Sequence, residues 1–94
     1  MQFLGIARPK TEFPASRSEE FLSILNDEAA HARAGYLNGT LRQLWLRGDG
    51  PGAIAIFEAD SEEEMRNIAA NFPLMRAGYY EFELIRLLPH GGFT

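Results

Sequence analysis

The chain has 94 residues, a length that fits one folded domain. Acidic residues outnumber basic ones by 13 to 9, and this balance excludes the clustered positive charge that nucleic-acid binding needs. The absence of cysteine excludes disulfides and cysteine-based metal sites. No apolar run approaches the roughly 20 residues of a membrane span. We therefore expect one cytoplasmic domain, residues 1–94, with no nucleic-acid or membrane partner.

Two regular elements are predicted in the first third of the chain. Residues 2–8 alternate in a strand pattern, in which Gly5 allows another group to approach the backbone closely. A capping box from Ser16 to Glu19 then predicts a helix over about 17–34, which should end at one of the glycines that follow.

One acidic residue of this helix, Glu28, falls on or beside its apolar face. His31 follows three residues later, a spacing that places both side chains on neighbouring turns of one surface. Two interpretations remain open. Glu28 and His31 can act together as a carboxylate–imidazole pair, or Glu28 can reach solvent while Asp27 and His31 form a surface pair.

The next stretch predicts a hairpin, with strands over 40–47 and 53–59 and a glycine-rich turn between them. Strict alternation along the first strand separates its side chains into two mixed sets. Leu41, Gln43, Trp45 and Arg47 should share one face, and Thr40, Arg42, Leu44 and Leu46 the other. Mixed faces indicate that both sides of the sheet are covered, one by helices and the other by a second subunit.

Two residues of this strand are candidates for ligand contacts. Trp45 is either a core or interface residue or a ring that stacks on a ligand. Arg42 either pairs with Glu81 or Glu83 or binds a ligand carboxylate.

A capping box from Ser61 to Glu64 opens a second helix, which Pro73 ends. Residues 72–80 then read as an irregular apolar loop, and such a loop should contact a partner subunit or a pocket. A last strand is expected over 80–88.

This order predicts an α+β fold of the ferredoxin-like type, βαββαβ. It would have a four-stranded antiparallel sheet with two helices on one face. The other sheet face would be bare in a monomer, so we expect a homodimer, a dimeric α+β barrel.

Several short motifs carry a family resemblance. They are Asp27-Glu28, the run Gly39 to Trp45, Ile56-Phe57-Glu58, Phe72-Pro73-Leu74, Glu83-Leu84 and His90. With these motifs the span from Asp27 to His90 resembles the muconolactone delta-isomerase family of dimeric barrels. The resemblance implies an isomerase of aromatic-compound catabolism that moves a proton and a double bond in a small unsaturated lactone or related carboxylate, with no cofactor.

That chemistry suggests roles for six residues. A base must stand near the substrate with a partly desolvated carboxylate, and Glu28 suits this role, with His31 as its catalytic partner. His31, Arg42 or Tyr79 can donate to the developing enolate. Arg42 is the first choice for a substrate carboxylate. Trp45, Tyr79 and Tyr80 would wall the pocket.

Other functions remain open at this level. One is a cofactor-free oxygenase or cyclase acting on an aromatic polyketide-like compound, by analogy of fold. Another is a small dimeric binding or assembly module without catalysis. No metal site is expected, because His31 and His90 have no chelating spacing. The dimers can also assemble into larger homo-oligomers.

Overall fold

The computed structural model describes residues 1–10 and 18–92. Its elements follow the predicted order, with one additional short helix before the last strand. They are β1 (Gln2–Pro9), α1 (Glu19–Asn38), β2 (Leu41–Leu46), β3 (Ala53–Glu58), α2 (Glu62–Ala70), α3 (Pro73–Arg76) and β4 (Tyr80–Leu87).

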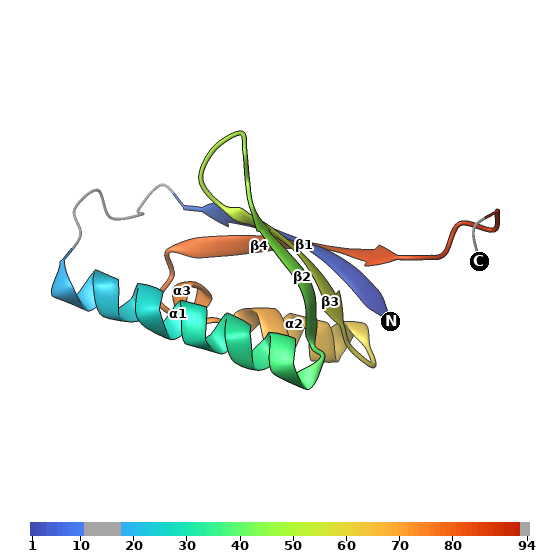
Figure 1. Ribbon diagram of the computed structural model, residues 1–94, viewed down its shortest axis with the longest axis horizontal. Coiled ribbons are helices and arrows are strands. Elements are labelled where there is room, and N and C mark those ends of the chain that lie inside the picture. Colours follow the sequence, from blue (N-terminus) through green and yellow to red (C-terminus); the bar gives the residue numbers. More distant parts are fainter. Residues whose placement is uncertain (11–17, 93–94) are drawn as a thin grey trace.

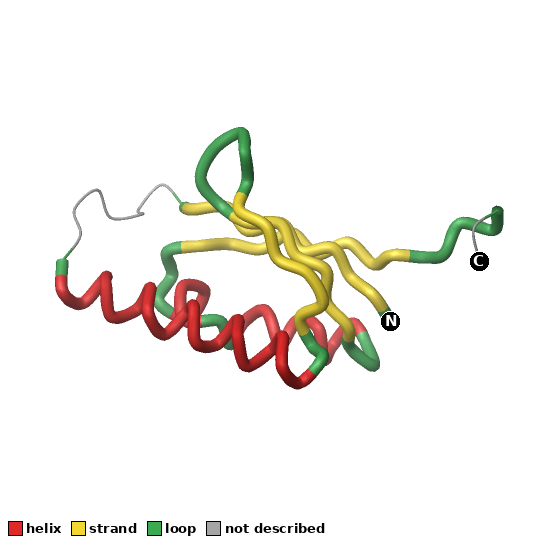
Figure 2. Tube along the Cα trace, viewed as in Figure 1, coloured by secondary structure: helices red, strands yellow, loops and turns green. Residues whose placement is uncertain are grey.

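The four strands form one antiparallel sheet in the order β2-β3-β1-β4. The helices all lie on one side of this sheet (Figure 1), and loops join the elements at the two ends of the strands (Figure 2). This arrangement confirms the α+β, ferredoxin-like fold expected from the sequence. Among the described residues, no helix is both long and apolar enough to cross a membrane.

The first helix starts slightly later than predicted and ends at the second of the two predicted glycine caps. Its N-cap is Ser18, whose Oγ accepts a hydrogen bond of 3.1 Å from the backbone N–H of Phe21. The predicted cap residue, Ser16, lies outside the described residues. The helix continues to Asn38 because the left-handed residue that ends it is Gly39, at φ 88°, and not Gly35.

The predicted faces of β2 are wrong for Leu41, because the strand contains a β-bulge. Leu41 pairs with Phe57 and Gln43 pairs with Ile56, although Phe57 and Ile56 are adjacent in β3. Arg42 is therefore an additional residue with no partner position in β3. The bulge changes the phase of the alternation. Leu41 therefore shares the helix-facing side with Leu44 and Leu46, and Gln43 and Trp45 lie on the opposite side.

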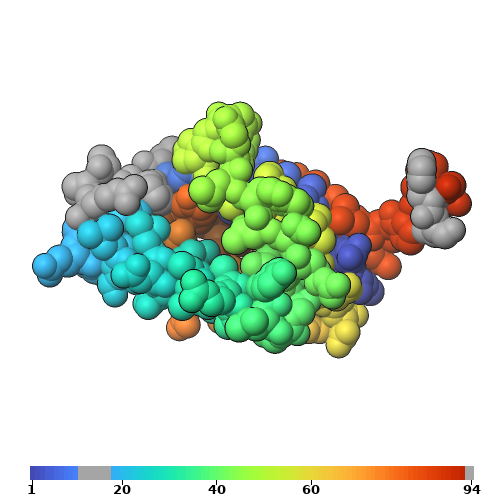
Figure 3. All heavy atoms as spheres, in the orientation of Figure 1, coloured from blue at the N-terminus to red at the C-terminus, as the bar shows by residue number. Residues whose placement is uncertain are grey.

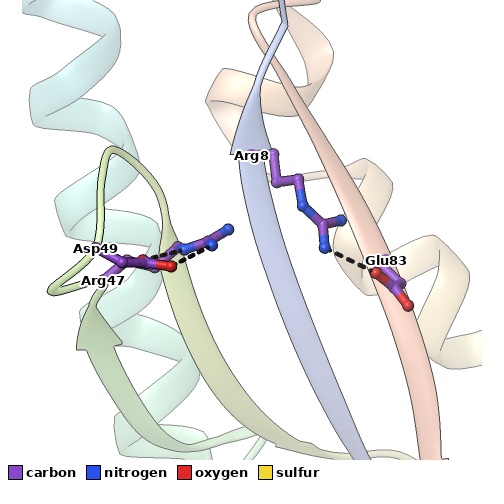
Figure 4. A network of polar contacts seen from close by, with 4 residues as sticks. All are labelled: Arg8, Arg47, Asp49 and Glu83. Carbon is purple, nitrogen blue, oxygen red and sulfur yellow. Dashed lines mark hydrogen bonds and ion pairs between the residues drawn. The ribbon is translucent and has the colours of Figure 1, made fainter.

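The alternative in which Arg42 pairs with Glu81 or Glu83 is also wrong. The strands β2 and β4 are the two opposite edges of the sheet. Glu83 instead accepts a hydrogen bond of 3.0 Å from Arg8 on the neighbouring strand β1 (Figure 4).

The segment after α2 is more regular and more buried than the predicted loop. Pro73 begins the single turn of α3, and the side chains of Phe72 and Leu74 on either side of it are buried. Gly78, at φ 81°, then allows Tyr79 to donate a backbone hydrogen bond of 3.0 Å to Leu74. The segment thus leads directly into β4 as a packed element.

The hydrophobic core lies between the sheet and the helices. Phe57 and Met65 are its largest fully buried side chains. The ring of Phe57 passes directly over Gly5, where an added Cβ would lie 2.7 Å from its Cε2 atom. This contact confirms that the glycine in β1 allows another group to approach the backbone.

No described helix covers the face of the sheet opposite the helices (Figure 1). The strand register brings its apolar side chains together in the middle of that face. They are Leu4, Ile6, Trp45, Ile54, Ile56 and Ile85. We call this set the open face.

Candidate active site

A cavity of about 250 Å³ lies between α1 and the sheet. An engineered cavity of about 150 Å³ is enough for benzene, so this one has room for a ring with several substituents. Figure 3 shows the surface hollowed between α1 and the hairpin of β2 and β3. Its lining is mainly apolar and comes from every layer of the fold. The apolar walls include Leu25, Ala32, Leu41, Leu44, Leu46, Ala55, Phe57, Phe72, Leu74 and Phe82.

Glu28 is the one charged side chain among the described residues that line this cavity. Its Oε1 atom accepts a hydrogen bond of 3.0 Å from the backbone N–H of Leu74. Burial raises the pKa of the Glu28 carboxyl above its ordinary value, and the Leu74 N–H and His31 partly oppose this shift. A carboxylate with a raised pKa in an apolar cavity has the properties of a general base.

Tyr80 supplies the second polar group of the lining. It lies at the start of β4 and is half-buried. Burial raises the pKa of its phenol, and the charge of Glu28 raises it further. The phenol therefore keeps its proton at neutral pH and can donate a hydrogen bond into the cavity.

His31 lines a different cavity, of about 230 Å³, on the far side of Phe72. The imidazole packs edge-on against the Phe72 ring, with 4.6 Å between the ring centroids. Phe72, Phe57 and Leu41 line both cavities and form the wall between them. The described link from His31 to Glu28 is electrostatic, because a positive charge on His31 lowers the pKa of the Glu28 carboxyl.

The other three predicted site residues do not line the main cavity. Arg42 is the exposed bulge residue of β2, and Trp45 is 50% exposed on the open face. Tyr79 packs edge-on against Phe21, with 5.6 Å between the ring centroids. The structure thus brings Glu28 and Tyr80 together and places His31, Arg42, Trp45 and Tyr79 elsewhere.

Sequence reasoning missed most of the cavity wall. Leu44 and Leu46 line the cavity together with Leu41 because the bulge turns all three to the same side of the sheet. Simple alternation of side chains along the strand does not predict this. Phe72 and Leu74 belong to the apolar segment 72–80, for which the sequence predicts contact with a partner subunit or a pocket, and both line the cavity. Within residues 1–10 and 18–92, no group of three or more His, Asp or Glu side chains is arranged to hold a metal ion.

The fold and the cavity define a small ferredoxin-like protein with a ligand-sized apolar pocket that one carboxylate faces. The sequence model of the muconolactone delta-isomerase family matches residues 1–92. The chain therefore belongs to the muconolactone delta-isomerase family, a family of small-molecule isomerases and related enzymes. No curated protein sequence matches the chain.

Two solved structures are similar in fold. A muconolactone isomerase shares 23% sequence identity at a TM-score of 0.78, covering 97% of this chain and 92% of its own. A 5-chloro-2-hydroxyhydroquinone dehydrochlorinase from Burkholderia phenoliruptrix AC1100, solved in complex with 2,5-dihydroxybenzoquinone, shares 20% identity at a TM-score of 0.65. That alignment covers both chains completely.

Proposed function

We propose that this protein is a cofactor-independent isomerase that moves a proton and a double bond within a small unsaturated lactone or a related ring compound. The observation that carries the proposal is the Glu28 carboxylate, which is partly desolvated and faces an apolar cavity of about 250 Å³. Desolvation strengthens a carboxylate as a base because it destabilises the charged form.

In the proposed reaction, Glu28 removes a proton from a carbon next to the conjugated system of the substrate. The electron pair of the broken C–H bond moves into the conjugated system and places negative charge on the carbonyl oxygen. Tyr80, with its phenol protonated, donates a hydrogen bond to that oxygen. Glu28 then returns the proton to a different carbon. One proton and one electron pair move within the substrate, so no oxidant or reductant is consumed.

A related elimination is the second candidate. The dehydrochlorinase with the same fold acts on a chlorinated hydroxyhydroquinone. Loss of chloride from such a ring also requires a base that removes a proton, and the Glu28 carboxylate can be that base. The substrate panel should therefore contain both lactones and chlorinated hydroxyhydroquinones. The product then shows whether the protein isomerises its substrate or eliminates chloride.

The proposed catalytic role has a direct test. A muconolactone-like lactone is incubated in deuterated water with the wild type, with Glu28→Gln and with Asp27→Asn, and the product and deuterium incorporation are followed by NMR. Asp27 is the matched control because it is the neighbouring carboxylate of α1 and is exposed. We expect Glu28→Gln to lower the rate about 100-fold or more. Asp27→Asn should keep the wild-type rate.

Equal rates for wild type and Glu28→Gln would remove Glu28 as the base. Saturable binding of the lactone without turnover by the wild type would instead support the non-catalytic binding module.

We also propose that the protein forms a homodimer through the open face. The support is the cluster of apolar side chains there, in which Trp45 is 50% and Ile85 40% exposed. Ile85→Lys should shift the protein to monomers in sedimentation velocity. Leu37→Lys is the control, because Leu37 is 78% exposed on α1, at the other side of the molecule. Dimers that persist in Ile85→Lys would exclude this face as the interface.

A further inference from the structure

Glu28 is held by a backbone group of a segment 46 residues away in the sequence. The N–H of Leu74 donates to Glu28 Oε1 at 3.0 Å. Within the described residues, no hydrogen bond occupies the other oxygen, Oε2. One oxygen of the carboxylate is therefore hydrogen-bonded to the protein, and the other can contact a substrate.

The turn around Leu74 does not use this N–H for its own hydrogen bonds. Met75 and Arg76 both donate to the carbonyl of Phe72 at 2.9 Å, and Ala77 donates to Pro73 at 3.0 Å. The N–H of Leu74 precedes these donors and has no carbonyl partner inside the turn. Because the Leu74 side chain is only 5% exposed, this N–H needs another acceptor, and Glu28 provides it.

The same residue is linked to the second polar group of the cavity. The carbonyl of Leu74 accepts the N–H of Tyr79 at 3.0 Å, immediately before Tyr80. The backbone of Leu74 therefore contacts Glu28 through its donor and fixes the start of β4 through its acceptor. Pro73 and Gly78, which shape the turn, hold both connections in place.

We propose that the main-chain N–H of Leu74 is a positioning group for catalysis, which holds Oε1 of Glu28 so that Oε2 faces the substrate. This inference rests on the proposed role of Glu28 as the base. Two other titratable groups bear on Glu28, namely His31 on the next turn of α1 and Tyr80 on β4. Neither of them donates a hydrogen bond to the carboxylate among the interactions described.

The test removes this N–H and leaves the side chain unchanged. Leucine at position 74 is replaced by its α-hydroxy acid analogue, so that an ester oxygen takes the place of the N–H. The ester also weakens the carbonyl of Pro73, which accepts the N–H of Ala77 inside the turn. The matched control is the same ester exchange at Arg76, which removes the hydrogen bond from Arg76 to Phe72 and weakens the carbonyl of Met75. This control leaves both the N–H and the carbonyl of Leu74 intact.

Two quantities are measured. The first is the pH profile of kcat/KM for the lactone, whose acid limb reports the protonation of the base. The second is the titration of the Glu28 carboxyl carbon by ¹³C NMR, assigned with Glu28→Gln, which needs no activity.

The N–H stabilises the charged form, so its loss raises the pKa of Glu28 and moves the acid limb to higher pH. With the ester at position 74 we also expect kcat to fall roughly 10- to 100-fold. The ester at position 76 should keep the wild-type pH profile.

The inference is overturned if the carboxyl of Glu28 titrates identically with and without the N–H, or if the esters at 74 and 76 give the same pH profile. Failure of the proposed function looks different. In that case Glu28→Gln keeps full activity, or the wild type turns over nothing in the substrate panel, whatever the NMR titration shows.

Discussion

Gly5→Ala is expected to destabilise the protein by crowding the ring that forms the cavity wall. The added methyl would lie 2.7 Å from Cε2 and 3.3 Å from Cδ2 of Phe57. Carbon atoms normally approach to only about 3.5–4.0 Å. The ring packs edge-on against Phe72 and Phe82 with centroid separations of 5.9 and 6.2 Å, so its displacement would disturb both contacts.

The magnitude follows from two opposing effects. Overpacking of a core costs about 1–3 kcal/mol. A Gly-to-Ala change recovers about 0.4–1 kcal/mol by restricting the unfolded chain. The difference between the two effects centres on about 1.3 kcal/mol of net loss, which in a domain of this size lowers Tm by roughly 5–10 °C. Phe57 also lines the main cavity, so its displacement should raise KM for a ligand bound there.

Thermal unfolding followed by circular dichroism measures the loss. Gly48→Ala is the matched control, because no atom lies within 4 Å of a Cβ placed there and Gly48 does not have a positive φ. It should stay within about 0.5 kcal/mol of wild type. If Gly5→Ala is as stable as Gly48→Ala, the Phe57 ring moves aside freely and the reasoning from close packing fails.

Three further predictions concern the site and a helix cap. Tyr80→Phe should lower kcat roughly 100-fold in steady-state assays, with Tyr79→Phe close to wild type, because only Tyr80 lines the cavity; equal losses in both variants would contradict this. The folded-state pKa of Glu28 is raised, so the ionised carboxylate reduces stability as pH rises through that pKa. Glu28→Gln should therefore have a larger free energy of unfolding than wild type in urea at about pH 8. This difference should vanish below the ordinary carboxyl pKa of 4.5, where the wild-type carboxyl is protonated. A difference that does not change with pH would refute the argument. Ser61→Ala should cost about 1 kcal/mol in urea unfolding, because the Ser61 Oγ accepts the N–H of Glu64 at 3.0 Å; unchanged stability would show that this cap contributes nothing.

Most of the fold could be predicted from the sequence because its signals are local. The capping box of α2 is an example: Ser61 accepts the Glu64 N–H, and the Glu64 side chain accepts the N–H of Asp60. The strand order follows from connection rules that leave few alternatives for βαββαβ. The sequence leaves two ends open for α1, because Gly35 and Gly39 are equally suitable caps, and the structure uses Gly39.

The site was less predictable because it depends on contacts between distant segments. Glu28 was singled out by its position on an apolar helix face, and Tyr80 by its place in an apolar segment, and both line the cavity. Arg42 and Trp45 looked equally suitable, but a bulge and the edge position of β2 place them outside the cavity. The hydrogen bond from Leu74 could not be foreseen, since a backbone N–H leaves no mark in a sequence.

The bulge at Arg42 affects how this chain should be compared with its relatives. Two residues of β2, Leu41 and Arg42, stand opposite one residue of β3. A relative with one residue fewer at this point would keep the same inward-facing side chains. A gap placed two positions later in an alignment would match Gln43 with a cavity position of the relative, and a gap placed four positions later would match Trp45 with another. Relatives should therefore be aligned so that each residue of β2 matches the one with the same partner in β3. This choice decides which β2 positions are assigned to the ligand cavity.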